Sequence, residues 1–223
     1  MQKLEVFGTN KLKGQIDISG SKNASLPVLA ATLLSDKKIY LSNLPKVKDI
    51  ETMINLLKSL GSKVKFEKKN LIIDNYNQNK KFAAYKLVKT MRAGILVLGP
   101  LLAKFGYAKV SLPGGCAIGS RPIDLHLKGL SKLGVEYKID QGYVHAVAPR
   151  GLKGSNIRFS KISVGATENL IIAACLAKGT TILNNCAIEP EIKDLTNFLI
   201  KLGCNIKWIT KRSIKIVGVK DIK

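Results

Sequence analysis

The chain has 223 residues with an apolar content of 46%, enough to build a proper core in one large domain or two small ones. No run of about 18 apolar residues is present and the opening residues MQKLEV lack the apolar stretch of a secretion signal, so we expect a cytoplasmic protein. The formal charge of +22 raises nucleic acid as a partner, but only five of the 37 basic residues are arginine and the lysines are scattered, which favours a solvated lysine-rich surface.

The amino-terminal stretches 3–7 and 15–19, on either side of Gly14, have the pattern of short strands. Beyond them the chain contains an internal repeat. Three copies share a Leu-x-x-Leu-Gly sequence followed by an alternating stretch, at 57–66, 130–139 and 199–208. Each copy predicts a helix that ends at a glycine and a strand that follows it.

A second apolar helix and a short strand precede each copy. The predicted helices cover 26–34, 95–104 and 169–177, and the predicted strands cover 39–42, 108–112 and 180–184. Each unit is therefore close to βαβαββ. Three such units can bury their inner helices against one another and keep the sheets outside, which predicts an α/β domain of the α+β type.

Polar residues stand just before the first helix of each unit, at equivalent positions: Lys22 with Asn23, then Arg92, then Ser163. Helix N-termini offer unpaired N–H groups and a favourable dipole, so three such ends can converge on one polyanionic ligand. Each residue alone has an ordinary explanation, as a solvated lysine, a surface ion-pair partner or a helix N-cap. Their repetition at equivalent sites favours a binding site.

The segment 111–125, SLPGGCAIGSRPIDL, has the composition of a ligand-binding loop. Its glycines permit positive φ and close backbone approach, and its two prolines stiffen the ends. Cys116 stands near Arg121 and several lysines, and a cationic neighbourhood favours the reactive thiolate. A single cysteine is more often a small buried residue, but glycines on both sides would hold this side chain out of a core.

The other chemistry-bearing residues predict no metal site and no disulfide framework. The four cysteines show no C-x-x-C pairing, and the two histidines have no partner at ligand spacing. These residues are Cys116, Cys175, Cys186, Cys204, His126 and His145.

Five stretches resemble, in the same order and at similar spacing, the signatures of the enolpyruvyl transferase family, and within it the UDP-N-acetylglucosamine 1-carboxyvinyltransferases. They are 18–24, 87–93, 112–126, 163–167 and 189–192. Family members are nearly twice as long, so the chain resembles their amino-terminal half. The resemblance implies an inside-out pseudo-threefold lobe of three βαβαββ repeats at about 22–90, 91–160 and 161–220, with residues 1–21 belonging to a second lobe outside this chain.

The implied reaction transfers the enolpyruvyl group of phosphoenolpyruvate to the 3-hydroxyl of UDP-N-acetylglucosamine and releases phosphate, as the first committed step of peptidoglycan synthesis, without a cofactor. Cys116 then supplies a proton at C3 of phosphoenolpyruvate or adds covalently at C2, and both roles stay open. Lys22, Asn23 and Arg121 match phosphoenolpyruvate-binding positions, with Arg92 as a further candidate for the phosphate. The general base and another arginine lie in the second lobe of family members, so the isolated chain should turn over little substrate.

Other positions match the nucleotide contacts of the family. Asp124 would accept a hydrogen bond from uracil, Leu125 would pack on the ring, and 161–164 would meet the diphosphate. The full set implied for UDP-N-acetylglucosamine is Arg92, Arg121, Pro122, Ile123, Asp124, Leu125, Lys161, Ile162, Ser163 and Val164. Glu189 and the stretch 46–49 also match family positions, where we expect structural ion pairs instead.

Two alternatives remain. The shikimate-pathway enolpyruvyl transferase shares the fold, but it does not use the cysteine of the Pro-Gly-Gly-Cys loop. A nucleic-acid-binding protein related to RNA 3′-terminal phosphate cyclase, which has similar repeats, would account for the charge. We expect neither a nucleic-acid nor a membrane partner, and we expect Cys116 to be the target of fosfomycin, the cysteine-directed inhibitor of the family.

Overall fold

The computed structural model describes residues 3–8, 11–88, 91–114 and 123–222, and it contains three successive repeats. The first repeat consists of α1 (Lys22–Ala31), the 3-10 helix η1 (Thr32–Leu34), β1 (Ile39–Ser42), α2 (Lys48–Ser59), β2 (Lys63–Glu67) and β3 (Asn70–Asp74). The predicted strand over 39–42 is therefore found at its predicted limits. The predicted helix over 26–34 begins four residues earlier, because Ser21 caps it by accepting a hydrogen bond from the backbone N–H of Ala24.

The other two repeats follow the same order with one added strand at the front, and the second repeat also has a short α-helix and a 3-10 helix before its inner helix. The second consists of β4 (Phe82–Ala83), α3 (Tyr85–Val88), η2 (Arg92–Val97), α4 (Leu98–Phe105), β5 (Tyr107–Ser111), α5 (Asp124–Lys132), β6 (Glu136–Asp140) and β7 (Tyr143–Val147). The third consists of β8 (Asn156–Arg158), α6 (Val164–Ala174), β9 (Thr180–Asn184), α7 (Pro190–Lys201), β10 (Asn205–Thr210) and β11 (Ser213–Val217).

The glycines of the repeated sequence end the outer helices as predicted. Gly61, Gly134 and Gly203 directly follow the last residues of the C-terminal turns of α2, α5 and α7 and have φ of +103°, +92° and +95°. Glycine adopts this left-handed conformation without the steric cost that a Cβ would bring. The chain then turns directly into the hairpin of each repeat.

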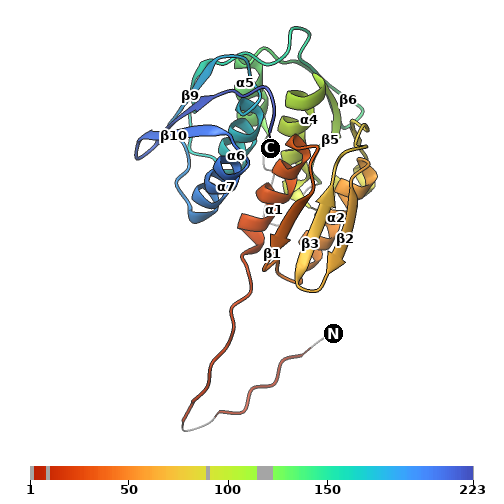
Figure 1. Cartoon of the computed structure of the whole chain (residues 1–223), viewed down its shortest axis with the longest axis vertical. Helices are drawn as coiled ribbons and strands as arrows, with labels where there is room; N and C mark the ends of the chain where they lie inside the picture. Colours follow the sequence, from red (N-terminus) through yellow and green to blue (C-terminus); the bar gives the residue numbers. More distant parts are fainter. Residues whose placement is uncertain (1–2, 9–10, 89–90, 115–122, 223) are drawn as a thin grey trace.

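Each repeat builds its own sheet. The strand orders are β1-β3-β2, β4-β5-β7-β6 and β8-β9-β11-β10, with antiparallel pairing except where β4 meets β5 and β8 meets β9. The inner helices α1, α4 and α6 gather in the middle and the sheets lie around them (Figure 1). Their buried apolar residues, such as Leu29, Leu101 and Ile171, belong to one continuous core. The predicted arrangement, with helices inside and sheets outside, is confirmed.

The prediction of two strands near the amino terminus is wrong for this structure. Residues 3–7 and 15–19 have extended backbone without strand pairing, and the segment leaves the body of the molecule (Figure 1). Its alternating apolar side chains remain in solvent, with Leu4 92% and Ile18 83% exposed. An alternating sequence forms a strand only where another strand supplies backbone partners, and the described part of the chain supplies none here.

The sheets also divide the chain differently from the predicted repeat limits. We placed 82–90 in the first repeat and 156–160 in the second, yet β4 and β8 pair within the sheets of the following repeats. The first repeat consequently has no leading strand among the described residues, and its sheet has three strands where the others have four.

Candidate functional site

The start of α1 presents Lys22 and Asn23, both exposed, directly after the N-cap Ser21. The Lys22 ammonium lies 2.9 Å from Oδ2 of Asp49, which stands in the first turn of α2. This ion pair fulfils our expectation for Asp49 in the stretch 46–49. Nearly half of the Lys22 side chain stays exposed, at 47%, so the ammonium is oriented by Asp49 and still open to an anionic ligand.

The start of α6 has the same construction. Ser163 caps it, and its hydroxyl oxygen accepts a hydrogen bond from the backbone N–H of Ala166 at 3.2 Å. Lys161 and Ile162 before the cap are exposed, and Ser163 and Val164 are half-buried. Ser163 therefore acts as an ordinary N-cap residue. The N-terminus of α6 can in addition bind an anion through its backbone N–H groups and its dipole.

The second repeat departs from this pattern. Arg92 begins the 3-10 helix η2, whose N-cap Met91 makes no side-chain hydrogen bond, and the α-helix starts only at Leu98. The expected α-helix N-terminus at Arg92 is therefore absent. Within the described part of the chain, one terminal guanidinium nitrogen of the half-buried Arg92 is shielded from solvent and has no hydrogen-bond partner. A shielded donor of this kind favours an anionic acceptor.

The start of α5 carries the residues matched to the uridine contact. Ile123 is the N-cap residue, and Asp124 is exposed and pairs with Lys128 at 3.4 Å. Leu125 is half-buried and lines a cavity of about 460 Å³ between α5 and β8, together with Arg158 and Phe159. Leu96 is only 3% exposed and belongs to the core.

A buried polar contact joins the elements that carry these residues. A ring nitrogen of His126 on α5 lies 3.1 Å from Nδ2 of Asn169 on α6, and the same amide donates to the backbone carbonyl of Ile95 on η2 at 3.1 Å. Burial lowers the pKa of His126 to about 4, against a smaller opposing effect of Asp124, so the ring is neutral at pH 7. The contact fixes α5, α6 and η2 relative to one another.

Sequence reasoning missed this contact, although a signal was present. Glu168 and Asn169 are two polar residues in the middle of the apolar helix α6, and both are buried. A buried polar side chain costs free energy unless it is hydrogen-bonded, so such residues in an apolar helix indicate a specific partner.

Replacing Gly99 with alanine is expected to reduce the free energy of unfolding by about 2 kcal/mol, because overpacked interior sites lose roughly this amount. Gly99 on α4 packs against α6 so closely that a Cβ would lie 2.2 Å from Oδ1 and 2.6 Å from the backbone oxygen of Asn169. The backbone atom cannot move aside without separating the two helices. Urea unfolding followed by the fluorescence of Trp208, the single tryptophan, measures the change.

Gly129→Ala provides the matched control, since Gly129 is also a buried glycine inside a helix. Its added Cβ would meet only side-chain carbons of Leu170, at 2.9–3.0 Å, which can rotate away. The gain in helix propensity, about 1 kcal/mol, offsets that adjustment. Equal losses in the two variants would contradict the assigned close contact between α4 and α6.

Three carboxyl groups face one another where α6 meets the start of α7. Burial, and to a smaller extent the neighbouring carboxylates of Glu191 and Glu189, together raise the pKa of Glu168 to about 8. The ion pair expected at Glu189 is not found in the described part of the chain. Its carboxylate instead accepts a hydrogen bond from the backbone N–H of Ile188 at 2.7 Å.

Three predicted site residues, Cys116, Arg121 and Pro122, lie outside the described residues. The other three cysteines are free and buried, which separates them from a reactive role. Burial raises the pKa of Cys186 to about 12, so its thiol stays protonated.

The described residues contain no group of three or more His, Cys, Asp and Glu side chains placed to hold a metal ion. Within the same ranges, no helix has both the length and the apolar character needed to cross a bilayer.

This three-repeat architecture is the fold of the enolpyruvyl transferases. The structure matches the enolpyruvyl transferase NikO from Streptomyces tendae with a TM-score of 0.80 at 20% identity, covering 95% of this chain and 50% of that one. It also matches an EPSP synthase from Acinetobacter baumannii with a TM-score of 0.71 at 15% identity, covering 94% and 48%.

Sequence comparison then assigns the family. The family model described as EPSP synthase (3-phosphoshikimate 1-carboxyvinyltransferase) matches residues 6–223, and the chain belongs to this family. Two relatives carry the name UDP-N-acetylglucosamine 1-carboxyvinyltransferase. The protein of Pelagibacter ubique is 77% identical over 223 residues, and that of a Sulfurovum species is 54% identical over 222. All of this chain is covered, but it spans only about half of these relatives, 54% and 53% of their length.

Proposed function

We propose that this chain is the amino-terminal lobe of an enzyme that transfers the enolpyruvyl group from phosphoenolpyruvate to the 3-hydroxyl of UDP-N-acetylglucosamine and releases phosphate. The identity of 77% with the UDP-N-acetylglucosamine 1-carboxyvinyltransferase of Pelagibacter ubique, across every residue of this chain, carries the proposal. We further propose that the enzyme works in the cytoplasm, at the first committed step of peptidoglycan synthesis, and that fosfomycin inhibits it. The second lobe would supply the remaining catalytic groups.

The charges of the described site fit these substrates. Phosphoenolpyruvate carries a carboxylate and a phosphate, and UDP-N-acetylglucosamine carries a diphosphate. Lys22, held by Asp49, and Arg92, with its shielded unpaired nitrogen, are suited to bind the first, together with Asn23 and Arg121. The capped start of α6 is suited to bind the diphosphate.

The nucleotide would lie between the starts of α5 and α6. The uracil ring would be held by Pro122, Ile123, Asp124 and Leu125, and the diphosphate by Lys161, Ile162, Ser163 and Val164, with Arg92 and Arg121 nearby. The contact between His126 and Asn169 supports this division of roles, since it holds α5 and α6 together. Substrate held in a fixed position between two lobes loses less entropy on the way to the transition state.

Cys116 is the proposed reacting side chain. As an acid its thiol would give a proton to C3 of phosphoenolpyruvate, and as a nucleophile its thiolate would add at C2. The shikimate-pathway alternative is not favoured, because the near relatives carry the other name. The nucleic-acid alternative has no support from these relatives either.

Thiol labelling tests the assignment of Cys116. Incubation of the native 223-residue chain with iodoacetamide should add one label per chain, at Cys116, because the other cysteines are buried at 0%, 0% and 5% exposure. Peptide mass spectrometry locates the label, and Cys116→Ser is the matched control that should take up none. Fosfomycin should modify the same residue in the full-length protein, with a rate that changes when UDP-N-acetylglucosamine is added. Failure of both reagents to label Cys116 would refute the reactive role.

A further inference from the structure

His126 is a buried residue of α5, 7% exposed, whose ring contacts α6 at two levels. Its Nδ1 lies 3.1 Å from Nδ2 of Asn169, in the middle of α6. A Cβ added to Gly165, in the first turn of α6, would lie 3.3 Å from both Cε1 and Nε2 of the same ring. We propose that His126 is a positioning residue for the nucleotide, and that its ring sets the separation between the starts of α5 and α6. This inference rests on the proposed function, which places the nucleotide between these two helix starts.

The amide of Asn169 determines which ring nitrogen of His126 carries the proton. The backbone carbonyl of Ile95 can only accept a hydrogen bond, so the amide nitrogen Nδ2 must face it, at 3.1 Å. The second hydrogen of Nδ2 is then donated to Nδ1 of His126, which must accept it. The proton of the neutral ring therefore lies on Nε2, at the edge of the ring that contacts the first turn of α6.

The absence of a side chain at Gly165 allows the ring to reach the start of α6. Gly165 is the second residue of the helix, two positions after the N-cap Ser163. The first N–H groups of a helix have no partner within it and are the groups that bind an anion. The ring of His126 consequently packs against the backbone that we propose for the diphosphate.

On the other helix, His126 directly follows the residues proposed for the uracil. It is the third residue of α5, after Asp124 and Leu125, so a displacement of its backbone would move them as well. The hairpin β6–β7 and the strand β8 separate α5 from α6 along the chain. The distance between the two helix starts therefore depends on packing contacts between them, and the ring of His126 provides one.

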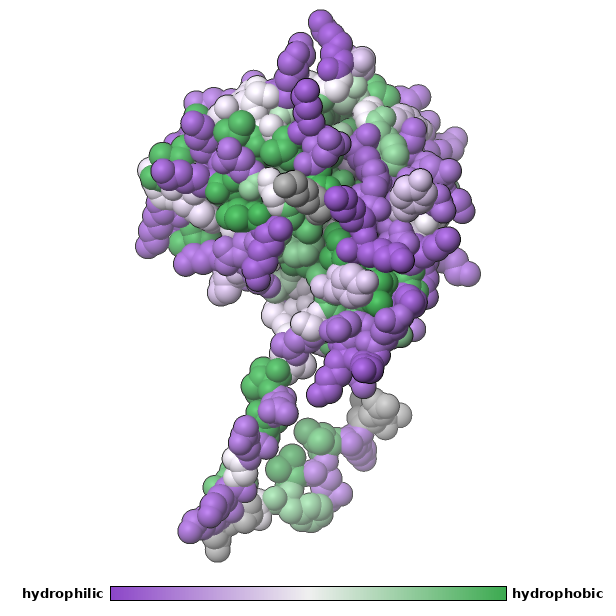
Figure 2. Space-filling view, viewed as in Figure 1, coloured by the Kyte–Doolittle hydropathy of each residue, from purple (hydrophilic) through white to green (hydrophobic). Residues whose placement is uncertain are grey.

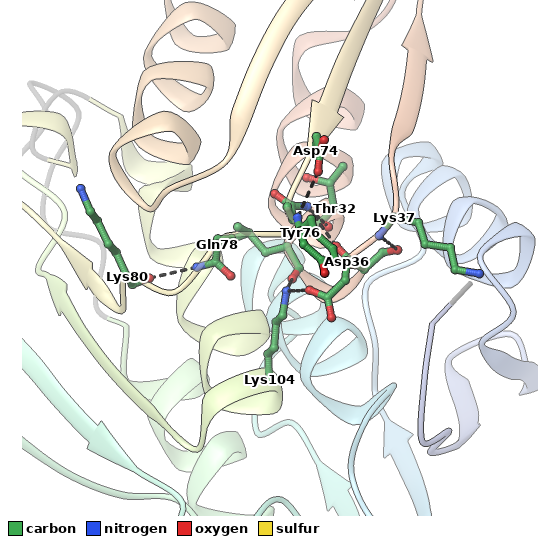
Figure 3. A network of polar contacts seen from close by, with 11 residues as sticks. Thr32, Asp36, Lys37, Asp74, Tyr76, Gln78, Lys80 and Lys104 are labelled. Atoms are coloured by element: carbon green, nitrogen blue, oxygen red, sulfur yellow. Dashed lines mark hydrogen bonds and ion pairs between the residues drawn. The ribbon is translucent and has the colours of Figure 1, made fainter.

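A different polar contact joins inner helices at their C-terminal ends. Lys104, in the last turn of α4, pairs with Asp36 and donates a hydrogen bond to the backbone carbonyl of Leu33 at 3.3 Å, next to Thr32 at the end of α1 (Figure 3). This contact does not involve α5. A substitution at His126 should therefore change the starts of α5 and α6 while this end of the lobe stays in place.

Substitutions of His126 in the full-length protein test the proposal. His126→Leu removes the acceptor for the Asn169 amide, and the dissociation constant for UDP-N-acetylglucosamine, measured by isothermal titration calorimetry, should rise about tenfold. His126→Asn should keep it within about threefold of the unmodified protein, because an asparagine oxygen can accept at about the position of Nδ1. His145→Leu is the matched control, since it removes the other histidine, on β7, and should leave the dissociation constant unchanged.

His126→Gln decides the case if the leucine variant does not fold. Its longer side chain places the amide at about the position of Nε2 and leaves the Asn169 amide without the Nδ1 acceptor, so we expect about the same tenfold loss. Restoration of binding by glutamine and not by asparagine would overturn the assigned contact between Nδ1 and Asn169.

Steady-state kinetics separate positioning of the nucleotide from a general loss of structure. In His126→Leu the KM for UDP-N-acetylglucosamine should rise with the dissociation constant. The KM for phosphoenolpyruvate, whose proposed ligands Lys22 and Asn23 lie on α1, should change by less than about threefold. Equal increases in the two KM values would contradict a role confined to the nucleotide.

The protonation of the ring can be observed directly by nitrogen NMR of the 223-residue chain with isotope-labelled histidine. Because the pKa of His126 is lowered to about 4, the spectrum should show Nε2 protonated and Nδ1 unprotonated at pH 7. A proton on Nδ1 at this pH would overturn the assigned contact.

The calorimetry also separates a failure of this inference from a failure of the proposed function. If the unmodified full-length protein does not bind UDP-N-acetylglucosamine, the proposed function is rejected and the role of His126 is rejected with it. If the unmodified protein binds and the folded His126→Leu or His126→Gln protein binds equally well, the role of His126 alone is rejected.

Discussion

Replacing Lys22 with methionine in the full-length protein is expected to lower kcat/KM for phosphoenolpyruvate by about 100- to 1,000-fold, since a preorganised charge in a closed site contributes this much to a transition state. The substitution keeps the length and apolar stem of the side chain and removes the ammonium that Asp49 orients. Phosphate release at varied phosphoenolpyruvate and saturating UDP-N-acetylglucosamine measures the loss.

Lys48→Met is the matched control, because Lys48 is an exposed lysine at the start of α2, next to Asp49. Its removal takes away the same net charge from the same region, so general attraction of anions is reduced equally. We expect kcat/KM to change by less than about threefold, because Lys48 is exposed and its charge is screened by salt. Similar losses in both variants would show that Lys22 acts only through the overall field and would remove it from the proposed site.

Replacing Glu168 with glutamine is expected to stabilise the protein increasingly as the pH rises. In the folded chain the pKa of Glu168 is raised to about 8 by burial and by Glu191 and Glu189, whereas in the unfolded chain the side chain ionises near its ordinary 4.5. Its contribution to stability is therefore fully present below pH 4.5 and is lost as the pH rises through 8. At about 1.4 kcal/mol per pH unit, the loss amounts to as much as about 5 kcal/mol.

The difference in free energy of unfolding between Glu168→Gln and the unmodified chain, measured by urea unfolding from pH 5 to 9, isolates this effect. His126 contributes with the opposite sign, since its lowered pKa makes stability fall as the pH drops from 6.5 through 4, but it does so in both proteins and cancels. The exposed Glu136 supplies the control substitution Glu136→Gln, which should give a pH-independent difference. A flat difference for Glu168→Gln would mean that its carboxyl is ionised in the folded chain.

Local patterns in the sequence predicted the repeated part of the fold well. The apolar spacing of the helices, the glycines at 61, 134 and 203 and the alternating stretches after them act within one repeat, and the structure confirms all three features. The leading residues 3–7 and 15–19 have an equally good strand pattern, but they pair with no strand in the described part of the chain. An alternating sequence predicts which face of a strand is apolar, but it does not predict which other strand will pair with it.

The sequence predicted the positions of several candidate site residues, but it did not predict the buried contact that holds their helices together. Lys22 and Ser163 stand at helix starts as predicted, and Asp49 forms the ion pair expected of it. Asp124, which we predicted to lie in the loop 111–125, instead begins α5. Spacing could not show that Asn169 connects His126 to the carbonyl of Ile95, since the three residues are separated by many positions along the chain. The resemblance to the family also did not predict that Arg92 begins a 3-10 helix.

The sequence analysis attributed the charge of +22 to lysines scattered over a solvated surface. Hydrophilic side chains cover most of the face of the body shown in Figure 2, and apolar side chains appear in small groups among them, apart from those on the leading segment. A surface of this kind suits attraction of phosphate-bearing substrates.

The placement of β4 and β8 in the sheets of the repeats that follow them has a consequence for how the molecule assembles. The hairpins β2–β3, β6–β7 and β10–β11 each close over a few residues and can form early, whereas the parallel pairs must wait for their neighbours to condense. Because the inner helices of all three repeats bury their apolar side chains in one continuous core, no repeat can be excised as an independent module. Melting of one should spread to the others, so the three units are expected to denature as a single cooperative block.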